Sequence, residues 1–151
     1  MLRDNQGNLI WQPTLKQEKF LQIPLSVKEG FYAGAVNAGK SDVLLMYPIV
    51  HGWHKHSQFK GLFLRRTMPE LRNEIIPRAR DYFKPFGANF NSTTGLWTFP
   101  SGALYFMGHC ENEDDVHNYD SMQPNYAAFD ELTSFTEWIY LYIVTPGGAN
   151  A

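Results

Sequence analysis

Short apolar runs alternate with stretches of helical spacing along most of this chain. The spacing of the apolar side chains predicts four helices, over residues 17–23, 42–51, 69–83 and 136–144. Pro69 stands near the start of the third helix, a favoured position because the first helical turn needs no backbone N–H there. Pro48 and Pro77 fall inside predicted helices, where a proline is expected to weaken or kink them.

Strands are predicted where aromatic and aliphatic residues form short runs. These runs cover residues 31–34, 62–64, 89–99, 103–107 and 126–129. A turn at residues 100–102 (Pro-Ser-Gly) joins the third strand to the fourth. Because most strands alternate with helices, we expect an α/β fold with a mainly parallel sheet flanked by helices.

The composition indicates one folded domain. The chain has 151 residues, of which 44% are hydrophobic and 15% aromatic, which argues against disorder. A lead-in segment is predicted over residues 1–30, a domain over 31–145 and a disordered tail over 146–151. The single cysteine, Cys110, fits a reducing compartment, and no run suits a membrane span or a signal peptide. We therefore expect a protein that is neither secreted nor bound to a membrane.

The charges are segregated along the chain. All 13 Lys and Arg residues precede residue 85, so the remainder carries acids without a compensating base. This asymmetry suits a polyanionic partner that binds the basic first half of the chain, or copies of the chain that associate head to tail. Alternatively, the charges of the two halves neutralise each other inside one domain.

One motif has the pattern of a phosphate-binding loop (Walker A), G-x-x-x-x-G-K-[ST]. It comprises Gly34, Ala35, Val36, Asn37, Ala38, Gly39, Lys40 and Ser41. Glycines let successive backbone N–H groups point at one phosphate, and the start of the next helix adds positive partial charge. Lys40 is expected to reach the β- and γ-phosphates of ATP, and the Ser41 hydroxyl to bind Mg²⁺. A surface turn with a solvated lysine is the alternative.

A phosphate-loop ATPase also needs carboxylates, and Asp130 and Glu131 follow a predicted strand (Walker B). Asp130 is the candidate for Mg²⁺, and Glu131 is the candidate base that orients or deprotonates the attacking water. Gln17 is a candidate for reading adenine through both ends of its amide. Arg65 and Arg66 follow another strand and are candidates for stabilising charge on the transferred phosphoryl group. Alternatively, these charged residues form helix caps or surface ion pairs.

Three histidines, His51, His54 and His56, suggest a metal at first sight. A structural zinc site needs four ligands, and neither a C-x-x-C pair nor a second histidine pair completes one. We expect no metal at these histidines.

Three longer strings resemble the ATPase domain of phage terminase large subunits, the motors that package double-stranded DNA into capsids. They are LFLRRTMPELR, LWTFPSGALYFMGHCENEDDVHNY and YAAFDELTSF, and the resemblance covers about residues 11–144. It implies a P-loop NTPase fold of the ASCE/RecA-like type, with ATP and Mg²⁺ as cofactors. On this resemblance the phosphate loop falls on residues 34–41, the Mg²⁺ aspartate on Asp130, the catalytic glutamate on Glu131 and the adenine-side glutamine on Gln17.

The resemblance also implies partners and a location. These are double-stranded DNA, a small terminase subunit, a portal protein, a homo-oligomeric ring and the cytoplasm of a bacterial host. Two features depart from the family pattern. The phosphate loop lacks the arginine that many members carry, and no arginine follows Arg80. Family members also continue into a nuclease domain, so the resemblance implies a truncated or shortened form.

Other classes of function stay open at this stage. A helicase or a small-molecule kinase shares the phosphate loop, but a kinase transfers phosphate to an acceptor. A nucleotide-binding remnant without turnover is the third possibility. ATP hydrolysis stimulated by DNA or by assembly distinguishes the motor from a kinase and from the remnant.

Overall fold

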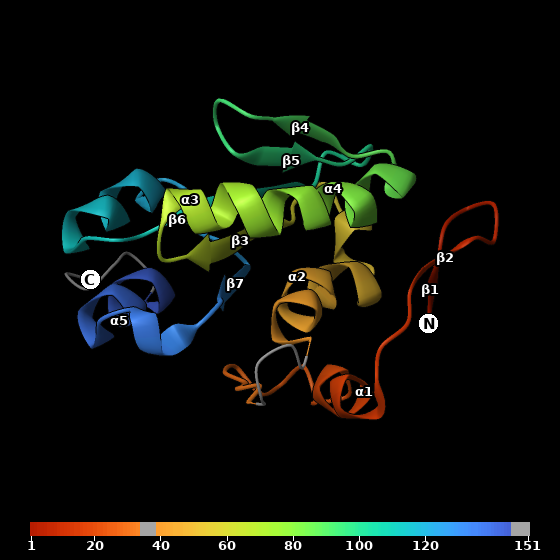
Figure 1. Ribbon diagram of the computed structural model, residues 1–151, viewed down its shortest axis with the longest axis horizontal. Helices are drawn as coiled ribbons and strands as arrows, with labels where there is room; N and C mark the ends of the chain where they lie inside the picture. The colour runs from red at the N-terminus through yellow and green to blue at the C-terminus, as the bar shows by residue number, and fades with distance from the viewer. Residues whose placement is uncertain (34–38, 146–151) are drawn as a thin grey trace.

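The computed structural model describes residues 1–33 and 39–145, and a five-stranded sheet organises most of them (Figure 1). Its strands lie in the order β4-β5-β6-β3-β7. Their bounds are Lys60–Arg65 for β3, Asn89–Asn91 for β4, Leu96–Thr98 for β5, Leu104–His109 for β6 and Tyr126–Phe129 for β7. A separate two-stranded sheet pairs β1, Leu2–Arg3, with β2, Leu9–Trp11.

The sheet is mixed, so the expected mainly parallel RecA-like sheet is wrong. β3 pairs in parallel with both β6 and β7, but β5 pairs antiparallel with both β4 and β6. Residues 89–99, predicted as one strand, contain two strands, β4 and β5, joined by a tight turn. The Asn91 side chain accepts hydrogen bonds from the backbone N–H groups of Thr93 and Thr94, and Gly95 takes a φ of 75° that favours glycine. The turn sends β5 back along β4, and β5 then pairs with β6.

The strand predicted over residues 31–34 is a second correction. Residues 31–33 have no regular secondary structure, and Gly34 lies outside the described residues. The sheet therefore has no strand directly before the phosphate loop within the part of the chain that the structure describes.

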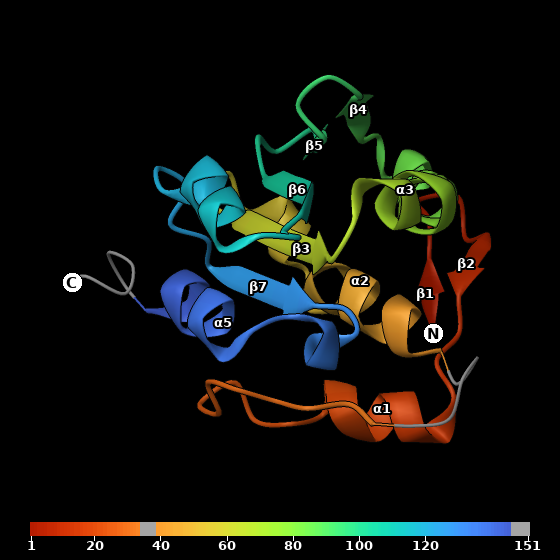
Figure 2. The same cartoon turned by 60° about the vertical axis from the view of Figure 1, so that its left-hand side comes forward.

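Helices cover both faces of the sheet (Figure 2). The α-helices are α1 Leu15–Leu21, α2 Lys40–Val50, α3 Met68–Glu70, α4 Ile76–Phe83 and α5 Glu137–Val144. Short helical turns are η1 Trp53–Lys55, the π-helical η2 Leu71–Ile75, η3 Lys84–Phe86, η4 Glu113–Tyr119 and η5 Leu132–Ser134. None of the helices in the described ranges has the length and apolar character that a membrane crossing requires.

The alternation of side chains along β3 explains the two layers of helices. Phe63 faces the larger core, which includes apolar side chains of α2 and α4. Leu62 and Leu64 face the opposite side, where Met122 and the α5 residue Ile143 pack against them. Both faces of β3 are therefore covered, and β3 also has a paired strand on each side, β6 and β7.

The predicted helix over residues 69–83 is confirmed as a continuous helical segment, α3-η2-α4. Its buried side chains recur every four residues, at Leu71, Ile75, Ala79 and Phe83. Pro77 does not break it; this proline lies just after the π-helical turn η2, where the regular hydrogen bonding of the helix is already interrupted. The buried row identifies the residues of this helix that face the core.

His54 is buried beside the rings of Phe86 and Phe99, at centroid distances of 5.2 and 5.5 Å. Its Nδ1 atom has no hydrogen-bond partner among the described residues. Burial, assisted by the charges of Lys55 and His56, lowers the pKa of His54 to about 4. The fold therefore holds this imidazole neutral.

We predict that His54 makes the free energy of unfolding depend on pH below about 6.5. Between about pH 6.5 and pH 4 the unfolded chain takes up a proton that the folded chain refuses, so stability falls as pH falls, by at most about 3 kcal/mol. Urea unfolding at several pH values measures this loss. His54→Gln should flatten the dependence, whereas Lys19→Gln, at an exposed residue that does not act on His54, should leave it unchanged; equal slopes for both variants contradict the prediction.

Candidate functional site

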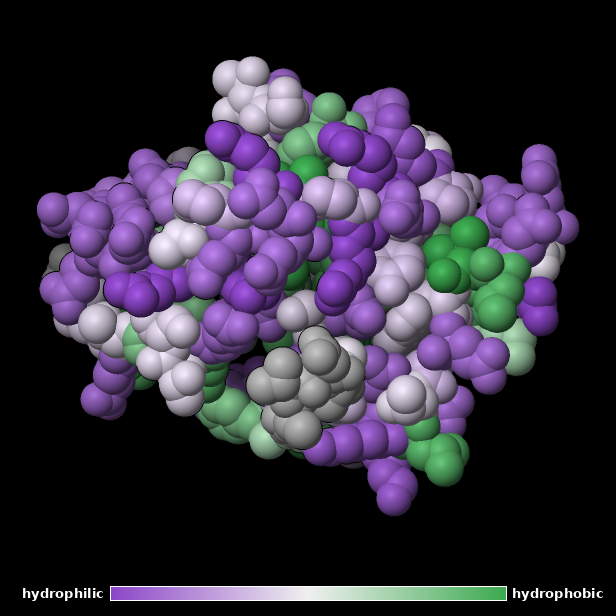
Figure 3. All heavy atoms as spheres, in the orientation of Figure 1, coloured by the Kyte–Doolittle hydropathy of each residue, from purple (hydrophilic) through white to green (hydrophobic). Residues whose placement is uncertain are grey.

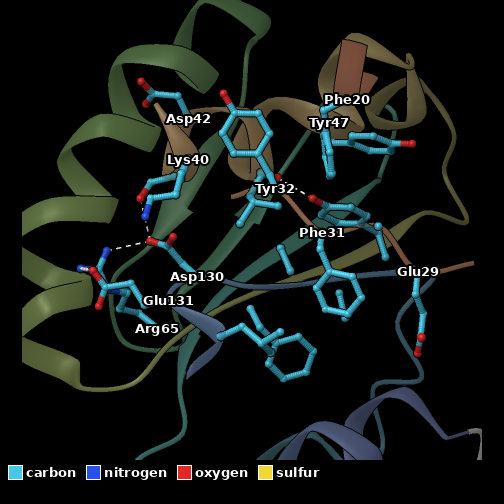
Figure 4. A pocket seen from close by; sticks show the side chains of 18 of the residues that line it. Phe20, Glu29, Phe31, Tyr32, Lys40, Asp42, Tyr47, Arg65, Asp130 and Glu131 are labelled. Atoms are coloured by element: carbon cyan, nitrogen blue, oxygen red, sulfur yellow. Dashed lines mark hydrogen bonds and ion pairs between the residues drawn. The ribbon is translucent and has the colours of Figure 1, made fainter. Parts of the chain in front are cut away.

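The ends of β3 and β7 meet the start of α2 at one edge of the sheet. The two strands are parallel, so their carboxyl ends lie side by side and bring Arg65 next to Asp130 and Glu131. A cleft of about 1670 Å³ opens there. Figure 4 shows Lys40, Arg65, Asp130 and Glu131 gathered on one side of this cleft, with aromatic rings on the other.

Arg65 is the centre of the polar cluster. Its Nη1 atom donates to Asp130 Oδ2 at 2.7 Å. Its Nη2 atom donates to Glu131 Oε1 at 2.9 Å and to Glu74 Oε2 at 3.0 Å. One guanidinium therefore joins β3, the end of β7 and the helical turn η2.

The burial of this cluster makes the pairing necessary. The side chains of Arg65 and Asp130 are 7% and 2% exposed, whereas those of Glu74 and Glu131 are about half exposed. Burial alone would lower the pKa of Arg65, but the carboxylates of Asp130, Glu131 and Glu74 outweigh it and raise the pKa. The guanidinium therefore stays charged. Removing either Arg65 or Asp130 would leave the other with a buried, unpaired charge.

Glu131 has an unusual backbone conformation. Its φ is 57°, in the left-handed region that residues other than glycine seldom adopt. Such conformations cost about 1–3 kcal/mol and persist where the surrounding structure holds them, often at functional sites. Here the Arg65 contact and the following turn η5 hold the Glu131 side chain beside Asp130.

The described part of the phosphate loop contacts this carboxylate cluster. The Ser41 hydroxyl donates to Asp130 Oδ2 at 2.7 Å, across 89 residues of sequence. Lys40 lies on the same side of the cleft (Figure 4). Gly39 caps α2 with a φ of 72°, the conformation for which glycine is suited. The remaining loop residues of the motif, 34–38, lie outside the described residues.

The structure places Gln17 in contact with Gly39, which directly precedes Lys40. Its Nε2 atom donates to the Gly39 carbonyl at 2.9 Å, and its Oε1 atom accepts from the Thr14 backbone N–H at 2.8 Å. A Cβ atom on Gly39 would lie 2.3 Å from Gln17 Nε2. One end of the buried amide therefore contacts Gly39 and the other caps the start of α1, and the adenine role stays a prediction.

One predicted candidate, Arg66, lies apart from this cluster. The structure also adds residues that the sequence analysis did not single out. Arg66 is exposed and forms no ion pair in the described ranges. Sequence reasoning missed Glu74 and the Asp42–Arg78 ion pair, whose atoms are 3.2 Å apart. Glu74 and Arg78 stand four residues apart on one flank of the predicted helix, and that spacing was the available signal.

The residues present fit a magnesium ion bound together with nucleotide. Within the described residues, no group of three or more His, Cys, Asp or Glu side chains is arranged to hold a metal. Mg²⁺ bound with nucleotide needs only one or two protein oxygens, because substrate phosphates and water supply the others. Ser41 Oγ and Asp130 Oδ2 are two such oxygens, although Asp130 Oδ2 also accepts from Arg65.

Comparison with known protein families, curated proteins and solved structures finds no match for this chain. The resemblance to terminase large subunits therefore stays a prediction from the quoted motifs.

We predict strong coupling between Arg65 and Asp130. Arg65→Ala should destabilise the fold by about 3–5 kcal/mol, because it leaves the buried Asp130 carboxylate without its ion-pair partner. Asp130→Asn should also destabilise, and the double variant should lose less than the sum of the two. Denaturant unfolding of the four proteins measures the coupling. The exposed Arg66→Ala is the control, and additive losses would contradict the pairing.

Proposed function

We propose that this chain binds and hydrolyses ATP with Mg²⁺ at the cleft between α2 and the end of β7. One observation supports this most: Ser41 and Asp130, singled out in two separate motifs, are joined by a 2.7 Å hydrogen bond. Chance placement of two motif residues 89 positions apart does not predict such a contact. Lys40 and Glu131 are in the same cleft, where phosphate binding and water activation require them.

Each residue of the site has a distinct role in this proposal. Lys40 and the N-terminus of α2 bind the phosphates, and Gln17 holds Gly39 in its left-handed conformation. Ser41 and Asp130 hold Mg²⁺, which neutralises charge on the phosphates when bound. Glu131 accepts the proton of the attacking water, and Arg65 positions both carboxylates through its two Nη atoms.

We further propose that ATP hydrolysis serves a viral DNA-packaging motor in the cytoplasm of a bacterial host. The support is the motif resemblance together with the excess of cations before residue 85, which suits a polyanion partner. Double-stranded DNA is that partner, and a homo-oligomeric ring with a small terminase subunit and a portal protein is the assembly that the resemblance implies. The mixed sheet is not part of this argument.

A nucleotide-binding protein without turnover is the second candidate. The observation that favours it is the bond between Arg65 and Glu131, which engages the proposed base. The contact occupies Glu131 Oε1, one of the two oxygens that could accept the proton of the attacking water. Binding without hydrolysis in the wild type would support this candidate.

We predict that Lys40→Ala weakens Mg-ATP binding by roughly 10- to 150-fold, because a charge-assisted contact to phosphate contributes about 1.5–3 kcal/mol. Isothermal titration calorimetry measures both affinities. Lys19→Ala is the matched control, since Lys19 is exposed and lies outside the cleft. Equal affinity for the wild type and Lys40→Ala would reject the phosphate loop.

We predict that Glu131→Gln keeps nucleotide binding but lowers the rate of hydrolysis by about 100-fold or more, the usual contribution of a general base. The isosteric amide cannot accept the water proton, whereas Asp130 and Ser41 stay in place. Phosphate release with and without duplex DNA measures turnover. The exposed Glu111→Gln should hydrolyse ATP at the wild-type rate, and an unchanged rate for Glu131→Gln would reject Glu131 as the base.

A further inference from the structure

The helical segment α3-η2-α4 has three distinct faces. The row of Leu71, Ile75, Ala79 and Phe83 faces the core. The residues that precede members of this row face the candidate site: Glu74 binds Arg65, and Arg78 binds Asp42. The residues that follow the same row must lie on the opposite flank, because a helix places neighbours about 100° apart.

That opposite flank is basic. Arg72, Arg80 and Lys84 each directly follow a buried residue of the row, and all three are exposed. None of the three forms an ion pair with any other described residue. The one remaining member of this flank, Ile76, is partly buried against the core. We call Arg72, Arg80 and Lys84 the basic row.

The acids of the same helix do not neutralise the basic row. Glu74 is engaged by Arg65, and Glu70 accepts a hydrogen bond from the Thr67 hydroxyl at 3.0 Å. Asp81 is the only acid of α4 and stands next to Arg80 in sequence. Three unpaired cations therefore outnumber the single acid beside them.

The surroundings also suit an anionic partner. Figure 1 shows the helix across the front of the molecule, with α2 on one side and the β4–β5 hairpin on the other. In the same orientation, Figure 3 shows a strongly hydrophilic surface over this helix. Residues 85–110, which include the hairpin, contain no acid, and its turn exposes Ser92, Thr93 and Thr94. Hydroxyl and backbone N–H groups of this kind donate to phosphate oxygens without reading sequence.

We propose that the basic row is the surface that binds the phosphate backbone of double-stranded DNA. The row extends over about 18 Å, from Arg72 to Lys84, at 1.5 Å per helical residue. Phosphates along one DNA strand are about 3.4 Å apart in projection on the axis, so the row can follow several of them. Binding is independent of base sequence, because only backbone contacts are made.

The proposal extends the motor function proposed above, but its test needs no ATP hydrolysis. The anisotropy of a fluorescent 20-base-pair duplex is measured against the full chain without nucleotide, at several salt concentrations. The variant carries Arg72→Gln, Arg80→Gln and Lys84→Gln, and circular dichroism verifies its fold. The control carries Lys19→Gln, Lys55→Gln and Lys60→Gln, three exposed cations elsewhere.

The basic-row variant should bind about tenfold more weakly or worse, and its salt slope should fall by about 0.9 for each phosphate contact removed. The control variant should bind like the wild type. Lys40→Ala should also bind DNA normally, so loss of ATPase activity alone leaves this proposal standing. Equal weakening of both triple variants, absence of duplex binding by the wild type, or equally tight binding of poly-glutamate would overturn it.

Discussion

The arrangement of the site depends on one buried guanidinium. Arg65 ends β3, a strand paired on both sides, and is only 7% exposed, so its charge needs partners inside the protein. Asp130 and Glu131 come from the end of β7 and Glu74 comes from η2, and all three are within 3.0 Å of the guanidinium. Displacing the end of β7 would remove Asp130 and Glu131 together and leave the buried guanidinium with the half-exposed Glu74 alone, at a cost of several kcal/mol. The same contacts that satisfy this charge therefore bring the candidate catalytic carboxylates together.

The helix that carries Glu74 connects this charge cluster to the outer surface. One of its flanks holds Arg65 through Glu74, and the other carries Arg72, Arg80 and Lys84. The π-helical turn η2 lies between α3 and α4, and such turns are frequent at functional sites because they interrupt the regular hydrogen bonding of a helix. A partner that shifts this helix would also move the Glu74 carboxylate relative to Arg65. The geometry thus provides a physical connection between a surface contact and the proposed base.

The sequence predicted those features that local patterns determine. The helix after Lys40, the helix over residues 69–83 and the Asp130–Glu131 pair at a strand end all follow from periodicity and neighbours in sequence. The mainly parallel sheet was wrong because two successive hairpins add antiparallel pairs. The predicted turn at residues 100–102 reverses the chain between β5 and β6, and an unpredicted turn at Gly95 reverses it between β4 and β5. The sequence also did not predict that Gln17 is buried. Its capping bond to Thr14 is local, but its contact with Gly39 crosses 22 residues.

The role of Arg65 shows why the remainder of the site needed the structure. At a strand end, an exposed arginine that acts on a neighbouring subunit and a buried arginine that holds carboxylates have the same sequence signature. Only the contacts with Asp130 and Glu131, 65 and 66 residues further on, distinguish them. These contacts also explain how the carboxylates stay together without a metal. Asp130 Oδ2 accepts from both Ser41 and Arg65, so the candidate metal-binding oxygen is held between two donors from different elements. A carboxylate oxygen has more than one lone pair, so these contacts orient Asp130 without closing it to a cation. Arg65 thus sets the position of both carboxylates before any ligand binds.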